Sequence, residues 1–218
     1  SLVITILTAF AFARLQFKGK ETLFALLLAT MMIPGELFTI TNYQTVSNFL
    51  GLKTLGTSML ETNRELAEKL IEMGDWKNTF TVLIVPFLVS VFYIYLLRQN
   101  FLQIPNELYL AAKVDGISDL KYLWKVMIPL AFPTLISITI LKMMGAWNSY
   151  VWPRLVANDE AHRLITNGLR NAFTTTPGDT NIPVQMAAVA IVSAPLFLVF
   201  IFLRKYIMKG VSRSGIKG

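Results

Sequence analysis

The 218-residue sequence contains no cysteine and a single histidine, His162. Without cysteine the chain cannot form a disulfide framework, a thiolate metal site or a cysteine nucleophile, and one histidine cannot build a histidine-rich metal site. His162 lies in the polar segment VANDEAHRL, where we expect a surface residue rather than a catalytic one. We therefore expect no metal site and no catalytic residue in this chain.

Two patterns typical of enzymes are also missing. No G-x-x-x-x-G-K-[ST] phosphate loop occurs, so we do not expect the chain to hydrolyse ATP. A membrane-embedded enzyme would need a constellation such as a serine with a histidine, or paired acids, near one depth. The sequence contains neither, which argues against an enzyme.

Charged residues are scarce: they make up 15% of the chain, against about 25% in ordinary soluble proteins. Hydrophobic residues make up 54%, and the mean hydropathy is +0.55. These values indicate that a lipid bilayer surrounds most of the chain. The net charge is +7, and the basic residues stand at the ends of apolar runs. This placement favours an anionic membrane surface, rather than nucleic acid, as their partner.

Five apolar runs are present, and about 20 apolar residues suffice to cross the hydrocarbon core. The runs cover residues 2–13, 23–40, 80–97, 128–147 and 182–203. Four meet or approach the spanning length. The first is shorter and has neither a basic start nor an A-x-A cleavage site, so we interpret it as a spanning helix that lacks its beginning. The sequence predicts an all-α, polytopic membrane helical bundle with five spanning helices.

Proline interrupts three of these runs. Pro34, Pro86 and Pro195 can each lie in a spanning helix when neighbouring helices satisfy the freed backbone groups. We expect static kinks at these positions rather than hinges.

The distribution of lysine and arginine between the runs predicts orientation, because short cytoplasmic loops collect basic residues. An excess of basic residues occurs in the first connection (ARLQFKGKE), in residues 98–127 and in the C-terminal tail. The other two connections contain balanced charge. We therefore expect the first and third connections and the C-terminal tail to be cytoplasmic.

The third connection contains the stretch IPNELYLAAKVDGISDLKYLWKVMIPL. Pro105 can occupy a first helical position, and Glu107 then lies where the helix dipole favours an anion. Gly116 supplies a left-handed helix stop, and Ser118 can cap a second helix that runs to Met127. We predict two short helices joined by a glycine corner.

One face of the first short helix contains small side chains. Leu108, Ala111 and Ala112 share this face at positions i, i+3 and i+4. Small side chains allow another backbone or a shallow groove to approach closely.

The segment L-A-A-K-V-D-G, followed by K-V-M-I-P-L, resembles the cytoplasmic EAA loop of ABC-importer permeases. The family pattern is E-A-A, three residues, glycine, nine residues and I-x-L-P. Leu110 replaces the family's glutamate, so Glu107 and Asp115 are the alternatives for the salt bridge made from that position. The residues in or near matching positions are Ala111, Ala112, Gly116, Val126, Ile128 and Pro129.

The resemblance covers nearly the whole chain. AFARLQFKGK, MMIPGELF, GAWNSYVWPRLV and LRKYIMKGVSRSGIKG resemble, in this order, segments of carbohydrate-type permeases, and most closely the smaller maltose-permease-like subunit. Family members usually have six spanning helices, and five here are consistent with a lost first helix. The resemblance implies one permease domain over residues 1–218, with a cytoplasmic coupling loop at 99–128.

The resemblance also implies partners. A second permease would complete the translocation path for a sugar or related solute, two ABC ATPase subunits would bind ATP and magnesium, and an extracellular or periplasmic solute-binding protein would deliver the solute. This chain would bind no cofactor and would lie in a bacterial or archaeal cell (inner) membrane. The implied ATPase-coupling residues are Glu107, Leu108, Leu110, Ala111, Ala112, Asp115 and Gly116.

Four residues are candidates for the translocation path: Lys142, Met144, Trp147 and Asn148. Lys142 is the only cation deep in an apolar run, and such residues usually face a bundle interior, a partner or a water-filled path. A tryptophan and an asparagine suit the C–H face and the hydroxyls of a sugar. In the alternative that we favour, Trp147 belongs with Tyr150 and Trp152 to an interfacial aromatic belt, and Asn148 caps the helix end.

An extra external amphipathic segment is expected at residues 54–78. Within TNRELAEKLIEMGDW, Thr62 and Glu65 have capping-box spacing, and Glu65 and Lys69 can form an i, i+4 ion pair. Gly74 can end this helix. Its apolar stripe consists of Leu66, Leu70 and Met73. A continuous stripe with mixed charge favours contact with the bilayer over contact with the binding protein.

An ion-coupled secondary transporter of a small solute is the alternative function. Such carriers use coupling groups near the membrane midplane and often contain an internal repeat. Only Lys142 lies deep in a run, and no repeat of fixed period is present. The sequence therefore favours the importer permease.

Overall fold

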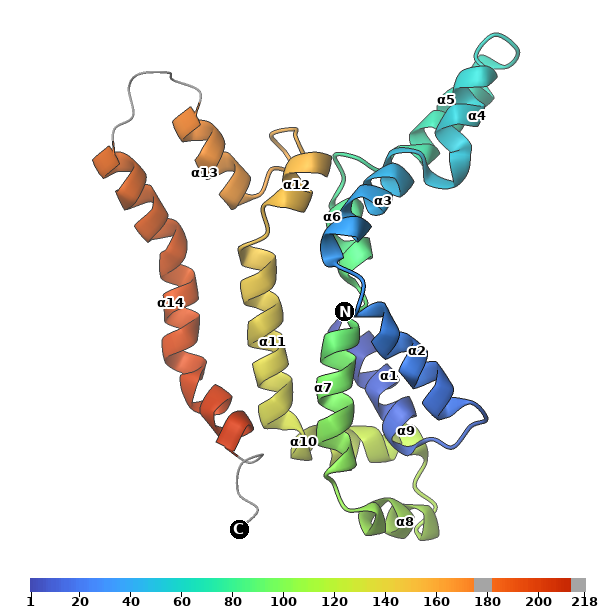
Figure 1. The fold of residues 1–218 in the computed structure, drawn as a ribbon, viewed down its shortest axis with the longest axis vertical. Coiled ribbons are helices and arrows are strands. Elements are labelled where there is room, and N and C mark those ends of the chain that lie inside the picture. Colours follow the sequence, from blue (N-terminus) through green and yellow to red (C-terminus); the bar gives the residue numbers. More distant parts are fainter. Residues whose placement is uncertain (175–181, 213–218) are drawn as a thin grey trace. The chain divides into compact units, whose positions relative to one another are not determined.

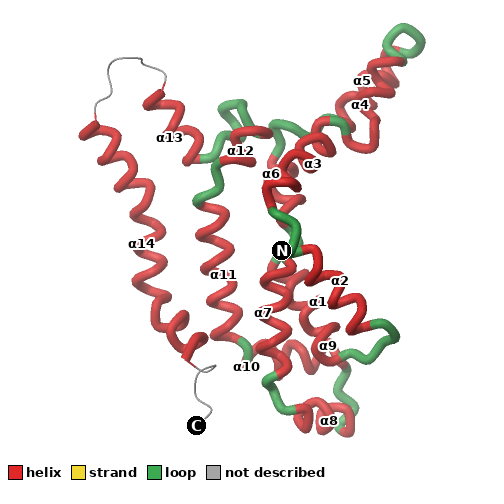
Figure 2. Tube along the Cα trace, in the orientation of Figure 1, coloured by secondary structure: helices red, strands yellow, loops and turns green. Residues whose placement is uncertain are grey.

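The computed structural model describes residues 1–174 and 182–212 (Figure 1). The described residues form helices and loops without a strand (Figure 2), which confirms the all-α prediction for this part of the chain. The helices group into two compact units. Unit 1 comprises Ser1–Met32, Val89–Ala146 and Ser193–Gly218, and unit 2 comprises Ile33–Leu88 and Trp147–Val192.

Unit 1 is built around the paired helices α1 and α7 (Figure 1). Its helices are α1 (Leu2–Arg14), α2 (Lys20–Thr30), α7 (Val91–Leu102), α8 (Asn106–Val114), α9 (Asp119–Tyr122), the π-helical turn η3 (Leu123–Met127), α10 (Ile128–Leu130) and most of α11 (Phe132–Trp147). Its apolar core joins one face of α1, α7, η3 and α11. Central members of this core are Phe10, Leu97, Phe101, Met127 and Ile138.

Unit 2 contains shorter helices. These are α3 (Gly35–Ser47), η1 (Phe49–Gly51), α4 (Leu52–Ser58), α5 (Arg64–Gly74), α6 (Phe80–Ile84), η2 (Val85–Phe87), α12 (Val151–Val156) and α13 (Ile165–Thr174). Trp152 is buried in its core, and its indole Nε1 donates a hydrogen bond of 3.0 Å to the Val82 carbonyl oxygen. The long helix α14 (Ile182–Ser212) contributes residues to both units.

By length and composition, one described helix can span a membrane: the Ile182–Phe202 part of α14. Three further pairs of helices pass the same test only when each pair, interrupted by a break, counts as one span. These pairs are Lys20–Thr30 with Gly35–Ser58, Phe80–Phe87 with Val91–Leu102, and Asp119–Leu130 with Phe132–Trp147. Helix α1 is apolar but shorter. The predicted count of five spans is thus not confirmed and stays a prediction.

The segment between 54 and 78 is a helical hairpin, because α5 packs on α4. A methyl group at Gly56 would come within 2.7 Å of the Ala67 carbonyl oxygen, so the two backbones approach closely. Ala67 is fully buried against α4, whereas Leu66 and Met73 of the predicted stripe are 42% and 60% exposed. Helix α5 therefore contacts Gly56 of α4 through Ala67 and Ile71, whereas Leu66 and Met73 of the predicted stripe stay exposed.

The start of α5 differs from the prediction. Asn63 precedes the helix, and its side-chain oxygen accepts a hydrogen bond of 3.1 Å from the Leu66 backbone amide. The capping box predicted from Thr62 is therefore wrong by one residue, because asparagine satisfies the free amide groups of the first turn equally well. The predicted ion pair between Glu65 and Lys69 is confirmed, at 2.8 Å.

Candidate coupling site

Helix α8 begins directly after Pro105, whose φ of −55° and ψ of 138° are not helical. The sequence predicted Pro105 as the first residue of this helix. In the structure Pro105 is instead the residue that precedes the helix. Glu107 lies in the first turn, as expected from the helix dipole. The proline fixes the direction in which α8 leaves the end of α7.

The C-terminus of α8 confirms the predicted glycine corner. Gly116 has a φ of +68°, its amide donates to the Lys113 carbonyl at 3.1 Å, and the Ile117 amide donates to the Ala112 carbonyl at 2.8 Å. This pair of bonds is a Schellman motif, which satisfies the last carbonyl groups of the helix through a residue in the left-handed region. The corner is a defined turn.

The second short helix also forms, with two differences from the prediction. Ser118 precedes α9, but its side chain makes no capping hydrogen bond. The helix continues through the wide turn η3 into α10, up to Leu130. Pro129 follows η3, and its lack of an N–H suits a turn in which the regular bonding pattern has already been interrupted. The chain therefore passes from α8 toward α11 through ordered helical turns.

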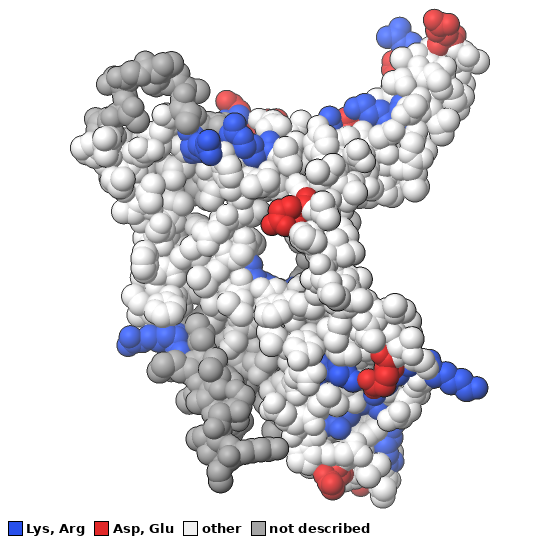
Figure 3. Space-filling model, viewed as in Figure 1, with Lys and Arg blue, Asp and Glu red and all other residues white. Residues whose placement is uncertain are grey.

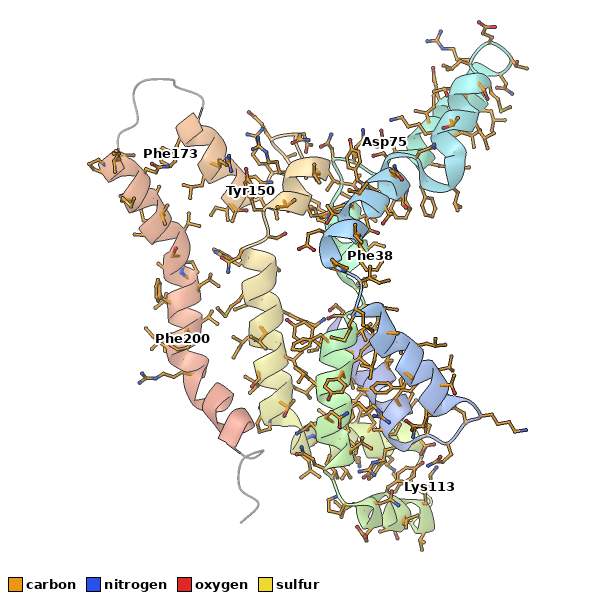
Figure 4. The ribbon with its side chains drawn as sticks, in the orientation of Figure 1. Phe38, Asp75, Lys113, Tyr150, Phe173 and Phe200 are labelled. Carbon is orange, nitrogen blue, oxygen red and sulfur yellow. The ribbon has the colours of Figure 1, made fainter. Side chains whose placement is uncertain are left out.

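An ion pair and a hydrogen bond join α8 to α9 across the corner. Lys113 Nζ lies 2.8 Å from Asp119 Oδ1, and the Tyr109 hydroxyl donates to the same oxygen at 2.9 Å. Figure 4 labels Lys113 on α8. The hydrogen bond to Asp119 raises the pKa of Lys113. Burial is the main cause that raises the pKa of Tyr109, and the hydrogen bond to Asp119 is the second. Both groups therefore keep their protons at neutral pH.

The predicted coupling residues divide between two faces of α8. Ala112 is buried in the core of unit 1, so it does not share an exposed face with Leu108 and Ala111. Leu108 and Leu110 are 43% and 55% exposed. The exposed members of the predicted set are Glu107, Leu108, Leu110, Ala111, Asp115 and Gly116. Helix α8 thus presents exposed apolar side chains while Ala112 anchors its opposite side.

Sequence reasoning missed Val114, which at 88% is the most exposed apolar residue of α8. It lies at i+4 from Leu110 and at i+3 from Ala111, so helical spacing alone could have added it to the same face. In Figure 3, charged side chains gather around α8 and the connection between α1 and α2, at one end of unit 1.

The four candidates for the translocation path lie in two units. Lys142 and Met144 belong to unit 1, and Trp147 and Asn148 belong to unit 2. Lys142 follows Leu135 and Ile138 on the core side of α11. Its Nζ contacts the Ser1 hydroxyl and lies 4.7 Å from the centre of the Tyr93 ring.

The tryptophans of unit 2 make hydrogen bonds within that unit. Trp147 Nε1 donates to the Val192 carbonyl at 3.3 Å. Trp152 is buried and bonded to Val82, so it does not form part of an exposed aromatic belt. The indole N–H groups of both residues therefore already have partners.

Unit 2 also contains a cavity of about 480 Å³ that the sequence did not predict. Figure 4 labels Tyr150 and Phe173, two aromatic residues of its lining. Thr166 and Gln185 add polar groups. Aromatic rings together with a few hydrogen-bonding groups suit a hydroxylated ligand.

Comparisons with known proteins place the chain in a family. The model of the "Binding-protein-dependent transport system inner membrane component" family matches residues 1–213. The arabinooligosaccharides transport system permease protein AraQ of Halalkalibacterium halodurans is 28% identical over 218 residues, which cover 100% of this chain and 68% of the relative. The sn-glycerol-3-phosphate transport system permease protein UgpE of Yersinia pestis is 23% identical over 213 residues, covering 98% of this chain and 67% of the relative.

A solved structure shares the fold. One chain of a bacterial ABC transporter involved in the import of the acidic polysaccharide alginate superposes with a TM-score of 0.69 at 24% sequence identity, covering 94% of this chain and 68% of that chain. The family match confirms the resemblance to ABC-importer permeases that the EAA-like segment and the flanking motifs indicated. This chain belongs to the family of binding-protein-dependent transport system inner membrane components, the membrane permeases of ABC importers.

Proposed function

We propose that this permease forms, with a second permease, the translocation path for a sugar or related solute, and that α8 couples this path to the ATPase subunits. The observation that carries the proposal is the exposed apolar face of α8 formed by Leu110, Ala111 and Val114, with Leu108 also exposed one turn before Ala111. Exposed apolar side chains on a short helix with a defined C-terminal turn suit insertion into a cleft of a partner protein.

The mechanism follows from the rigidity of the corner. The ATPase subunits bind ATP and magnesium, and this chain binds no cofactor. When the ATPases close, α8 moves with the cleft that holds it. The Schellman turn at Gly116 and the Lys113–Asp119 ion pair keep α8 and α9 in one arrangement, so the movement reaches α11 through η3 and α10. Transport then requires two alternative packings whose populations depend on bound nucleotide.

The proposed topology has five spanning helices in this chain, with α8 and the C-terminal tail in the cytoplasm. The excess of lysine and arginine in the first and third connections and in the tail supports it. The opposite side then contains the α4–α5 hairpin, α12 and α13, where an external solute-binding protein would deliver the solute. The breaks within three candidate spans are compatible with proline-containing membrane helices.

Carbohydrate is the proposed class of solute. Similar permeases are named for arabinooligosaccharides and for sn-glycerol-3-phosphate, and the structurally similar transporter imports alginate. The aromatic and polar lining of the cavity at Tyr150 supports a hydroxylated solute. Lys142, Met144, Trp147 and Asn148 are proposed to contribute to the path.

The first experiment is to tag the chain in its native membrane, purify it in mild detergent and identify stoichiometric partners by mass spectrometry. We expect a second permease and an ABC ATPase. Recovery of the chain alone, or only with copies of itself, would contradict coupling through α8. The ion-coupled carrier would then be tested by reconstituting the chain alone under an ion gradient.

A further inference from the structure

Arg14 connects three helices of unit 1 through one buried guanidinium group. It is the last residue of α1 and is 7% exposed. Its Nη2 donates to the carbonyl oxygens of Phe101 and Ile104, at 3.0 and 2.5 Å. Its Nη1 donates to the side-chain oxygen of Asn106, the first residue of α8, at 3.2 Å. The end of α1, the end of α7 and the start of α8 therefore share one side chain.

The electrostatics of helix ends explain this position. The last carbonyl groups of α7 lack partners within the helix and carry partial negative charge, so they favour a cation. Pro105 has no N–H to offer them. A guanidinium group has donors in a planar fork and can therefore bond several acceptors at once. Arg14 thus bonds the Phe101 carbonyl of α7, the Ile104 carbonyl just after this helix and the Asn106 side chain in a single geometry.

A second buried arginine makes a comparison possible. Arg98 Nε donates to the Phe12 carbonyl at 3.1 Å, and Arg98 Nη2 lies 3.3 Å from Glu21 Oε2. The Arg98 guanidinium also lies 4.0 Å from the centre of the Phe24 ring. Arg98 therefore joins α7 to α1 and α2, and its hydrogen bonds and ion pair among the described residues do not reach α8. Of these two arginines, only Arg14 also bonds α8, through Asn106.

We infer that Arg14, through Asn106, is the positioning residue that makes α8 move as one body with α1 and α7. This inference rests on the proposed function. It gives α8 a second route into the membrane helices, at the opposite end from the Gly116 corner. Movement of the ATPases then reaches α1 and α7 through the guanidinium, and α11 through η3. Loss of the Asn106 bond should leave α8 folded and anchored through Ala112, but weaken the transfer of its movement to α1 and α7.

The test uses the complete transporter in lipid nanodiscs, containing this chain, its partner permease and the ATPase subunits. Backbone hydrogen exchange is compared between the nucleotide-free state and the state trapped with ATP, magnesium and orthovanadate. Asn106→Leu is the decisive variant because Asn106 is exposed and its loss should not prevent folding. Asn106→Asp keeps an acceptor for Arg14, and Lys18→Gln removes an exposed charge from the same surface.

In the wild type, trapping should change the exchange of amides in α1 and α7 as well as in α8. In Asn106→Leu, we expect the change in α1 and α7 to fall by at least about fivefold, the lower end of typical allosteric coupling, while α8 still responds. Asn106→Asp and Lys18→Gln should resemble the wild type. Arg14→Lys should behave like Asn106→Leu, because one ammonium group cannot reproduce the fork.

Three results would overturn the inference: an unchanged response of α1 and α7 in Asn106→Leu, no response of these helices in the wild type, or an equal loss in Lys18→Gln. Failure of the proposed function gives a different result, because no ATPase would then be recovered with the wild-type chain. If Arg14→Lys fails to assemble, the comparison of Asn106→Leu with Asn106→Asp still tests whether the Arg14–Asn106 bond transmits the movement.

Discussion

Lys113 and Asp119 form an ion pair of 2.8 Å across the left-handed turn at Gly116. The pair lies on the surface, and exposed ion pairs add little stability by themselves. The role of this ion pair is geometric. Together with the hydrogen bond from the Tyr109 hydroxyl to Asp119, it fixes the angle between α8 and α9. The backbone at Gly116 determines whether the two partners can meet.

Gly116→Val should therefore reduce transport-linked ATPase activity more than membrane insertion. A side chain at this position would meet nothing within 4 Å, so the cost comes from the φ of +68° and not from crowding. A β-branched residue in the left-handed region costs about 1–3 kcal/mol. The measurement is ATPase activity of the reconstituted transporter, normalised to the amount of inserted permease.

Gly116→Asn is the matched control, because asparagine tolerates the left-handed region better than other residues with a side chain. It should retain more coupling than Gly116→Val. Normal coupling in Gly116→Val would contradict the role of the glycine corner.

Gly56→Ala should loosen the α4–α5 hairpin. The added methyl group would lie 2.7 Å from both the Ala67 carbonyl oxygen and the Ile71 Cγ1 atom. Overpacking of this kind costs about 1–3 kcal/mol. Hydrogen exchange of α5 amides should accelerate, whereas the exposed change Thr57→Ala should have little effect. Equal exchange in the two variants would show that the helices do not pack at Gly56.

The same hairpin should weaken in acid through Asp75. Burial would raise the pKa of Asp75, but the hydrogen bonds from Lys53 and the Lys77 amide, with the charges of both lysines, lower it overall. A folded-state pKa below the unfolded value of 3.8 means that this stabilisation is present above the unfolded value and is lost as pH falls through the folded one. Hydrogen exchange of α5, corrected for the intrinsic rate, should therefore accelerate below about pH 4.

Asp75→Asn provides the control for this pH dependence, since its side chain does not titrate. The variant should be less stable than the wild type at pH 6, and the difference should shrink toward pH 3. A constant difference across this range would exclude Asp75 as the titrating group.

Lys142→Met should preserve assembly and reduce solute uptake. An ionisable residue within a spanning helix is costly, so replacing it with an apolar residue of similar length should not lower the stability of the complex. If Lys142 serves the path, uptake should fall by about tenfold, equivalent to about 1.4 kcal/mol. Uptake in proteoliposomes and the thermal stability of the complex are measured together. Unchanged uptake would assign Lys142 to packing against Tyr93 only.

Local chemistry made several features predictable from the sequence. The glycine corner follows from the unusual backbone freedom of one residue beside a good helix former, and the Glu65–Lys69 pair follows from helical spacing. Capping was less certain, because Thr62 and Asn63 are adjacent residues and the side-chain oxygen of either type can accept a hydrogen bond from an amide of the first turn. The packing of α5 against α4 buries Ala67, whereas Leu66 and Met73 of the predicted stripe stay exposed.

The sequence by itself determined the apolar runs, the charged connections between them and the short helix ending at Gly116, because hydropathy, charge and backbone preference act over neighbouring residues. Only the tertiary structure decided that Ala112 faces inward, that Trp152 bonds Val82, and that Arg14 reaches residues about 90 positions away. These contacts depend on which helices pack together. A guanidinium group has no local preference for one distant helix end over another, so its partners are set when α1 and α7 come together.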